Sequence, residues 1–281
     1  MHDPRPILEQ LDHNRPLVMG ILNATPDSFS DGGTWGTVDR AVAHAEQMLT
    51  NGADIIDVGG ESSRPGAESV DLDTEVERVI PVIERLAGRC VLSVDTAKPE
   101  VAEAAIASGA HIVNDITASL ETVAAAGNAG WVAMHMQGEP RTMQKTPTYD
   151  NVVREVTDSL RQATERGRAA GVEHLWLDPG IGFGKSTTHN LELLQSIRKL
   201  AMVDEKLVVG VSRKRLVGEL HAASDRAQNV AGLADRLEGS IVAAVWSWYH
   251  SAHIVRVHDV RASVLAAKHC QDMAASGQDG Y

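Results

Sequence analysis

The sequence predicts an α/β protein that folds as a closed (β/α)8 barrel. Short apolar runs rich in Val and Ile alternate with longer, alanine-rich amphipathic stretches, and eight such pairs of about 35 residues each fill the 281-residue chain. The apolar runs contain few polar residues, which is typical of parallel strands buried on both faces. An open doubly wound sheet is the alternative, but eight evenly spaced units without a visible second domain favour a single TIM barrel.

We expect one domain over residues 1–281, with an N-terminal extension at 1–14 and a flexible tail at 275–281. The expected strands span 16–23, 53–60, 90–95, 111–115, 131–136, 174–180, 206–212 and 253–258. The expected helices lie near 38–50, 73–86, 98–108, 120–128, 150–170, 189–200, 230–249 and 259–275. Helix starts are indicated by Asp71, Asp73, Lys98 with Pro99, Thr148 and Asp150, and helix ends by Gly52, Gly109, Gly130 and Gly171. The longest irregular segments are 24–37, 60–72, 137–149 and 218–229, and in a barrel the loops that follow strands form the active-site face.

Composition and charge exclude several classes of protein. The chain is 43% hydrophobic and 23% charged, which argues against a disordered or fibrous protein. Its net charge of −12 argues against a nucleic-acid partner, because proteins that bind nucleic acids carry a basic face. The N-terminus lacks an apolar signal region, no apolar run is long enough to span a bilayer, and two cysteines are too few for a disulfide framework. We therefore expect a cytoplasmic protein with no membrane partner.

Polar side chains recur at the ends of the predicted strands. Capping of the following helix explains any one of them about as well as a shared site does. All eight units carry at least one, which capping does not explain, and in a barrel these side chains converge on one pocket. They are Asn23, Asp57, Glu61, Asp95, Asn114, Asp115, His135, Asp178, Ser212, Arg213, Lys214, Arg256 and His258.

Two charge types indicate the ligand. Cations near the loops suit an anionic ligand, because guanidinium groups match phosphate or carboxylate oxygens; they are Arg64, Lys185, Arg213, Lys214, Arg215, Arg256 and His258. The acidic and amide groups beside apolar strand residues are expected to be buried, and they need hydrogen-bond donors. A heterocycle with amino and ring N–H groups would supply those donors to Asp57, Asp95, Asn114 and Asp178.

Other sites fit the sequence less well. The loop at 178–187 resembles a Walker A loop, but Pro179 occupies the first glycine position. A class I aldolase is disfavoured because the sixth strand ends in Asp178 rather than an amine. The 12 histidines show no zinc-ligand spacing, and His135 is either a core residue or a pocket wall. Trp246 and Trp248 are expected to pack in the core.

Eight motifs run through nearly the whole chain: GILNATPDSFSDGG (20–33), DVGGESSRPGA (57–67), SVDT (93–96), HIVNDI (111–116), MHMQGEPRTMQ (134–144), LDPGIGFGK (177–185), VGVSRK (209–214) and RVHDV (256–260). In these motifs and in their order, the chain resembles the bacterial dihydropteroate synthase family. The resemblance implies a barrel fold, in agreement with the count of strands and helices. It also implies a folate-pathway transferase that joins 7,8-dihydropterin-CH2-pyrophosphate to p-aminobenzoate and releases pyrophosphate and 7,8-dihydropteroate.

The resemblance also implies roles for individual residues. The pterin would contact Asp95, Asn114, Met134, Asp178, Phe183, Gly210 and Lys214. The pyrophosphate would contact Asn23, Arg64, Arg256 and His258, and Asn23 would also bind Mg²⁺. The p-aminobenzoate side, where sulfonamides compete, would be shaped by Phe29, Ser63, Arg64, Pro65, Ser212 and Arg215. Catalysis would rest on Asp95, Lys214, Arg256 and His258, with loops 24–37 and 61–70 excluding water.

Three features of the sequence depart from the family pattern or leave alternatives open. Arg215 replaces a frequent Ser, and we hypothesise that it pairs with the p-aminobenzoate carboxylate. The segment 115–134 is shorter and 218–235 longer than usual, and the longer one could alter the surface of an expected homodimer. A methyltetrahydrofolate-binding methyltransferase and a pterin-binding homologue without synthase activity remain alternatives. The first has no use for a pyrophosphate site, and the second should have lost the intact loop motifs.

Overall fold

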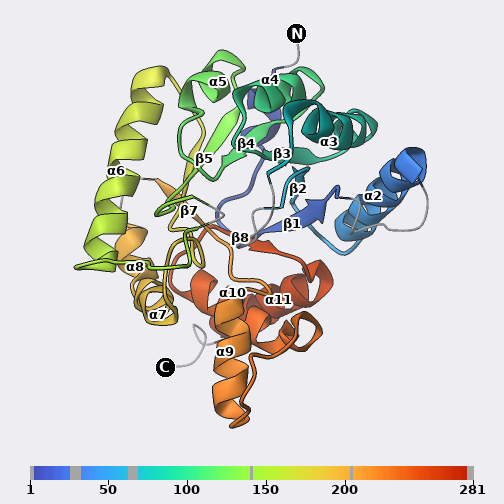
Figure 1. Cartoon of the computed structure of the whole chain (residues 1–281). Coiled ribbons are helices and arrows are strands. Elements are labelled where there is room, and N and C mark those ends of the chain that lie inside the picture. Colours follow the sequence, from blue (N-terminus) through green and yellow to red (C-terminus); the bar gives the residue numbers. More distant parts are fainter. Residues whose placement is uncertain (1–2, 26–32, 63–68, 140–141, 203–204, 277–281) are drawn as a thin grey trace.

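Eight parallel strands close into one barrel in chain order (Figure 1). The computed structural model describes residues 3–25, 33–62, 69–139, 142–202 and 205–276. Each strand pairs with the next one in the sequence, and the last pairs with the first. The closed barrel and all eight predicted strands are confirmed: β1 (Leu17–Asn23), β2 (Ile55–Gly59), β3 (Val91–Asp95), β4 (Ile112–Asp115), β5 (Gly130–Met134), β6 (Leu175–Asp178), β7 (Lys206–Val209) and β8 (Ile254–Val257).

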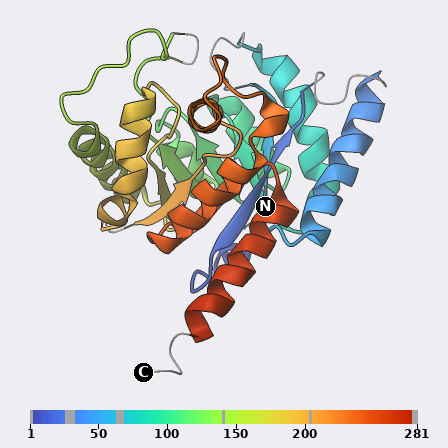
Figure 2. The same cartoon turned by 90° about the horizontal axis from the view of Figure 1, so that it is seen from below.

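Helices surround the barrel and alternate with the strands (Figure 2). They are α1 (Arg5–Leu8), α2 (Gly33–Thr50), α3 (Leu72–Leu86), α4 (Pro99–Ala107), α5 (Glu121–Ala126), α6 (Val152–Ala170), α7 (Thr187–Gln195), α8 (Ile197–Leu200), α9 (Arg215–Ser224), the short 3-10 helix η2 (Leu233–Asp235), α10 (Leu237–Tyr249) and α11 (Val260–Ser276). In Figure 2 the loop after β5 lies on the upper side, whereas α11 runs downward to the opposite side. The loops that follow strands therefore gather at one end of the barrel.

Local signals account for several helix boundaries. Asp71 caps α3, because its carboxylate accepts a hydrogen bond from the backbone N–H of Thr74 at 2.9 Å. Gly171 ends α6 in the left-handed conformation, with φ at 93°. The expectation for Gly130 is wrong: it begins β5, and a Cβ there would lie 2.5 Å from the ring of Trp176, so its small size is required by packing rather than by a helix end.

The region after β7 differs most from the prediction. Residues 218–229 were expected to be irregular, but helix α9 spans Arg215–Ser224. The helix buries only Leu216, Val217 and Gly218, so its apolar pattern is too short to reveal it in the sequence. The helix expected at 230–249 begins at Leu237 instead. Trp246 is 44% exposed, so its assignment to the core is wrong, whereas Trp248 is partly buried against the core.

The core has two layers that follow the alternation of side chains along each strand. Residues of the outer layer face the surrounding helices and include Val18, Ile56, Leu92, Val113 and Leu177. The intervening residues face the barrel interior, where Met19, Ile55, Val91, Ile112, Val132, Trp176, Val208 and Ile254 form one cluster. Leu8 of α1 is 1% exposed and joins this interior cluster, so part of the predicted N-terminal extension closes the barrel floor.

Within the described ranges, none of the helices has both the length and the apolar character that crossing a membrane requires.

Candidate active site

The strand register brings the predicted site residues together above the interior cluster. A residue two positions after an interior one faces the same side of its strand. Ile112 is followed in this way by Asn114, Trp176 by Asp178 and Ile254 by Arg256. The same step leads to Asp57, Met134 and Gly210 from the interior residues of β2, β5 and β7. The barrel therefore stacks a polar layer directly on an apolar one.

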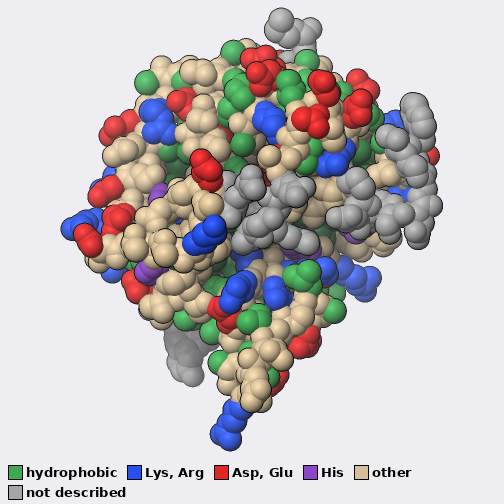
Figure 3. Space-filling view, viewed as in Figure 1, with side chains coloured by type: hydrophobic (Ala, Val, Ile, Leu, Met, Phe, Trp, Pro, Cys, Tyr) green, Lys and Arg blue, Asp and Glu red, His purple; other side chains and the backbone are tan. Residues whose placement is uncertain are grey.

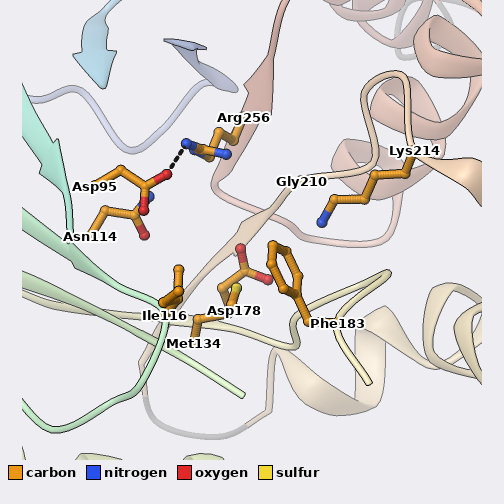
Figure 4. A pocket seen from close by; sticks show the side chains of 9 residues that line it. All are labelled: Asp95, Asn114, Ile116, Met134, Asp178, Phe183, Gly210, Lys214 and Arg256. Carbon is orange, nitrogen blue, oxygen red and sulfur yellow. Dashed lines mark hydrogen bonds and ion pairs between the residues drawn. The ribbon is translucent and has the colours of Figure 1, made fainter. Parts of the chain in front are cut away.

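Most of these side chains line one pocket that opens to solvent (Figure 4). Its lining residues are Asp95, Asn114, Ile116, Met134, Asp178, Phe183, Gly210, Lys214 and Arg256. All seven residues predicted for the pterin are among them. Figure 4 shows Lys214 and Phe183 pointing toward Asp178, with Asp95 and Asn114 on the opposite wall.

Arg256 is the centre of an ion-pair network on one wall of the pocket. Its guanidinium donates to Asp95 Oδ2 at 2.5 Å and to Asp57 Oδ2 at 2.6 Å. Asn114 Nδ2 donates to the same Asp57 oxygen at 3.0 Å. Burial lowers the pKa of Arg256, but Asp57 and Asp95 outweigh burial and hold that pKa above its ordinary value. The guanidinium is therefore a permanent cation fixed between two carboxylates.

The opposite wall is formed by Lys214, Phe183 and Asp178. The Lys214 ammonium lies 4.4 Å from the centroid of the Phe183 ring and donates to the backbone carbonyl of Ile181. Burial lowers the pKa of Lys214 to about 8, although Asp178 opposes this. Burial likewise raises the pKa of Asp178, against the effect of Lys214 and of the Gly180 N–H that donates to it at 2.7 Å.

Burial also raises the pKa of Asp95, and Arg256 opposes that rise. The pocket thus holds acids and an amine whose pKa values have moved toward neutrality, as is common where such groups bind or transform a ligand.

Lys and Arg side chains gather between the centre and the lower part of the face in Figure 3, whereas Asp and Glu side chains dominate its top. The lining of the pocket itself balances the carboxylates of Asp95 and Asp178 with the cations of Lys214 and Arg256.

His258 and Ser212 lie together beside the pocket. The Ser212 hydroxyl is 3.1 Å from His258 Nδ1 and accepts a hydrogen bond from the His258 backbone N–H at 3.1 Å. These residues come from the loops after β8 and β7, so the hydroxyl fixes one loop against the other. Asn23 ends β1 and pairs in register with Gly59 of β2, which places it at the same end of the barrel.

Three predicted cations have protein partners in this structure. The Lys185 ammonium is buried among backbone carbonyls and His135, so its assignment to an anionic ligand is wrong. Arg213 forms a bidentate ion pair with Asp259, which leaves its predicted role toward an anion open. Arg215 is 78% exposed and donates to Glu219 at 2.6 Å, which leaves its predicted role open. His135 is not among the residues that line the pocket; it lies behind them, in contact with Lys185.

Some predictions lie outside the described residues, and two pocket features were missed. Phe29, Ser63, Arg64 and Pro65 are not among the described residues, so their roles remain predictions. Ile116 lines the pocket but was not predicted, because an apolar side chain in a loop carries no chemical signal. Asp57 was predicted to accept donors from the ligand, but it accepts from Arg256 and Asn114 and is not among the residues that line the pocket. Its pairing with Arg256 was not predicted, although the period-two step from Ile55 turns both side chains inward.

Comparison with known proteins identifies the family. The family model described as "Pterin binding enzyme" matches residues 19–258, which span the barrel from β1 to the loop after β8. The chain is 48% identical over 266 residues to dihydropteroate synthase from Escherichia coli strain K12, and the match covers 92% of each sequence. The chain belongs to the dihydropteroate synthase family.

Solved structures of family members agree with this assignment. The Yersinia pestis dihydropteroate synthase in complex with a sulfonamide drug is 42% identical, with a TM-score of 0.86 and coverage of 94% of this chain and 96% of that chain. The Xanthomonas albilineans dihydropteroate synthase with 4-aminobenzoic acid is 43% identical, with a TM-score of 0.86 and coverage of 94% of both chains. The barrel and the sequence together place this chain among the enzymes of the family.

Proposed function

We propose that this enzyme condenses 7,8-dihydropterin-CH2-pyrophosphate with p-aminobenzoate, giving 7,8-dihydropteroate and pyrophosphate. The observation that carries the proposal is the pocket itself: all seven residues that the family resemblance assigns to the pterin line one cavity. Asp178 and Asn114 offer acceptors for the amino and ring N–H groups of the heterocycle. Met134 and Phe183 provide apolar surfaces for its flat faces, and Lys214 provides a donor for a ring acceptor.

The charges of the pocket suit the bond changes of this reaction. The amine nitrogen of p-aminobenzoate forms a bond to the pterin methylene carbon, the bond from that carbon to the pyrophosphate oxygen breaks, and the amine loses a proton. Positive charge that develops on the pterin is stabilised by the carboxylates of Asp95 and Asp178. Arg256, in β8, and His258, which follows it, would bind the departing pyrophosphate anion. No side-chain nucleophile is needed.

A magnesium ion fits this site as a partner of the substrate rather than as a resident of a protein cage. The described residues contain no group of three or more His, Cys, Asp or Glu side chains arranged for a metal. Mg²⁺ commonly takes one or two protein oxygens and completes its shell with water and substrate phosphates. Asn23 would supply the amide oxygen, and the ion would neutralise the pyrophosphate as it leaves.

The p-aminobenzoate side of the site is proposed to lie near Ser212 and Arg215, together with Phe29, Ser63, Arg64 and Pro65, which are outside the described residues. Sulfonamides would compete there, as the sulfonamide complex of the Yersinia pestis relative supports. Arg215 would leave Glu219 and pair with the substrate carboxylate. If Arg215→Ala leaves the KM for p-aminobenzoate unchanged, this role is wrong.

Pyrophosphate release is the direct test of the proposed reaction. The purified enzyme is given dihydropterin pyrophosphate and Mg²⁺, with and without p-aminobenzoate. Release that depends on p-aminobenzoate and yields dihydropteroate supports the proposal. Pterin binding without release would favour an inactive binding homologue, and methyl transfer from methyltetrahydrofolate would favour the methyltransferase alternative.

We also propose that the enzyme is a cytoplasmic homodimer that pairs through α10. Val242, Trp246 and Tyr249 are 68%, 44% and 76% exposed, and their spacing places them on one side of the helix. A cluster of exposed apolar side chains on one helix face is typical of an interface. The free thiols of Cys90 and Cys270 suit a reducing compartment.

The oligomeric state can be tested by light scattering. Val242→Glu, which places a charge on this face, is expected to give monomers at micromolar concentration. Met202→Glu, at an apolar side chain that is 80% exposed elsewhere, serves as the control and is expected to leave the dimer intact. A dimer that survives Val242→Glu would mean that α10 is not the interface.

A further inference from the structure

Lys185 is a buried cation that the proposed reaction does not use. The residue is 2% exposed, and its ammonium lies inside the loop that joins β6 to α7. It donates to the carbonyl oxygens of Gly180 and Phe183, both at 2.9 Å, and of His135 at 3.2 Å. His135 Nδ1 is also 2.9 Å away. Burial lowers the pKa of Lys185 to about 7, and the nearby Asp178 opposes this. The protonated side chain has three N–H donors, and these four acceptors occupy all of them.

In the hydrogen bond between Lys185 and the ring of His135, the ammonium is the donor and the ring is the acceptor. Burial, and then the Lys185 charge, lower the pKa of His135 to about 3, so the ring is neutral at physiological pH. The ring nitrogen facing the ammonium therefore accepts a hydrogen bond. Burying an ammonium costs free energy unless polar partners replace its water, and here every partner belongs to the two loops that the ammonium joins.

These partners are neighbours of pocket residues. His135 directly follows Met134 at the end of β5, and Phe183 itself lines the pocket. Gly180 donates its backbone N–H to Asp178 at 2.7 Å. The ammonium thus holds the backbone at three points, each of which lies beside or within the wall that faces the pterin.

The loop has little freedom to adopt another conformation at these points. Gly180 has φ at 64°, and a Cβ there would lie 1.8 Å from the His135 carbonyl oxygen. Gly184 has φ at 61°, and a Cβ there would lie 2.2 Å from the carbonyl oxygen of Gln137. The backbone of this loop therefore packs directly on the loop after β5, and three carbonyl oxygens are left converging on a small interior space. Lys185 fills that space with donors.

We propose that Lys185 is a positioning residue, which shapes the pterin pocket by holding Phe183 and the Ile181 carbonyl in place against Lys214. It does so without touching the substrate, because its donors are already engaged. This inference rests on the proposed pterin site. It separates Lys185 from Lys214, whose ammonium faces the pocket.

The test compares Lys185→Met and Lys185→Gln with the parent enzyme. Met keeps an unbranched side chain that is one atom shorter and removes every donor, whereas Gln keeps two donors. Lys199→Met, at an exposed position on α8, is the matched control. The measurements are the melting temperature, the affinity for 6-hydroxymethylpterin by calorimetry, and the KM for each of the two substrates.

Lys185→Met is expected to weaken binding of 6-hydroxymethylpterin by about tenfold or more, because three carbonyls lose their donors and the wall relaxes. The KM for the pterin substrate should rise while the KM for p-aminobenzoate stays within about twofold. Lys185→Gln should fall between parent and Met, and it carries the test alone if the Met variant does not fold. Lys199→Met should match the parent.

Three results would overturn the inference. Unchanged pterin affinity in the folded variants would mean that the wall does not need Lys185. A loss confined to the pyrophosphate-bearing substrate, with 6-hydroxymethylpterin binding intact, would make Lys185 a phosphate contact. An equal rise in both KM values would indicate a general loss of structure. Failure of the parent enzyme itself to bind the pterin would instead contradict the proposed function.

Discussion

Arg256 donates to Asp95 Oδ2 at 2.5 Å, so the cation proposed for the pyrophosphate is ion-paired with a carboxylate proposed for the pterin. The two residues come from opposite parts of the chain, and their strands β8 and β3 are separated in the barrel by β1 and β2. The two subsites are therefore parts of one electrostatic network. A change at either residue should affect binding of the whole pterin pyrophosphate rather than one half of it.

Arg256→Lys tests this coupling. A lysine keeps the positive charge, but its compact ammonium cannot bridge Asp57 and Asp95 as the guanidinium does. One of two buried carboxylates would lose its partner, at a cost of about 2–4 kcal/mol. We expect kcat/KM for the pterin substrate to fall by about 30-fold to 1000-fold, measured by steady-state kinetics.

Arg85→Lys is the control for that substitution. Arg85 donates to Asp39 at 3.1 Å, and both side chains are more than half exposed. An exposed ion pair contributes little, so this variant should keep parent kinetics within about twofold. If Arg256→Lys also stayed within that range, the bridge between the two carboxylates would have no part in binding.

The pH profile should show a basic limb set by Lys214. Its pKa is lowered to about 8 by burial, so the ammonium loses its proton, and its donor to the pterin, as the pH rises through that value. On the acid side, burial raises the pKa of both Asp95 and Asp178, so the acid limb should lie above the ordinary value of 3.8. We expect kcat/KM for the pterin substrate to be bell-shaped between these limbs.

Lys214→Arg identifies the group responsible for the basic limb. A guanidinium stays protonated throughout the accessible pH range, so the variant should lose activity overall but show no decline near pH 8. The comparison requires kcat/KM from about pH 5 to pH 10 for both proteins. A basic limb that persists unchanged in the variant would assign it to another group.

The accuracy of the sequence predictions differed between regular structure and individual contacts. The strands could be predicted because buried parallel strands are short, apolar and evenly spaced, and each such run in this chain became a strand. The pocket residues could be predicted because polar groups at strand ends converge in a barrel. Helix α9 could not, since only Leu216, Val217 and Gly218 of its residues are buried and the helix has no long apolar stripe.

Lys185 and Arg213 show why the site could not be completed from the sequence. The sequence of a glycine-rich loop does not show whether its lysine binds a phosphate or carbonyl oxygens. Lys185 contacts His135 only because β5 and β6 are neighbours, and Arg213 contacts Asp259 only because β7 and β8 are. Such contacts depend on proximity in three dimensions, which the spacing of residues in the sequence does not show.

A comparison of Gly180 with Gly88 distinguishes the effect of backbone strain from the effect of a steric clash. Both have positive φ, at 64° and 72°, but a Cβ at Gly180 would meet the His135 carbonyl oxygen at 1.8 Å, whereas one at Gly88 would meet nothing within 4 Å. Gly88→Ala should cost about 1 kcal/mol of stability and leave kinetics unchanged. Gly180→Ala should displace the loop, so that the KM for the pterin substrate rises by about tenfold or more. Equal behaviour of the two variants in kinetics would mean that this loop does not shape the pocket.

The histidines at the barrel floor should make stability depend on pH. His13 lies 6.0 Å from the ring of Trp176, and its pKa is lowered to about 4, first by burial and then by the charges of Lys206, His253 and His174. Because the unfolded chain takes up this proton near pH 6.5 and the folded chain only near pH 4, the unfolded state binds more protons in between. The free energy of unfolding should therefore decrease as the pH falls from about 6.5 to about 4.

Substitution of His13 by Phe is expected to weaken this dependence. Phe keeps a ring against Trp176 but takes up no proton, so the variant should lose less stability than the parent between pH 7.5 and pH 4.5 in urea titrations. His13 is half-buried, so solvent screening keeps the difference small, at most about 1 kcal/mol. His269→Phe, at an exposed position on α11, should leave the slope of the parent unchanged. Parallel curves for the parent and His13→Phe would show that His13 does not contribute to acid sensitivity, and His135, His174 or His253, whose pKa values are also lowered by burial, would then account for it.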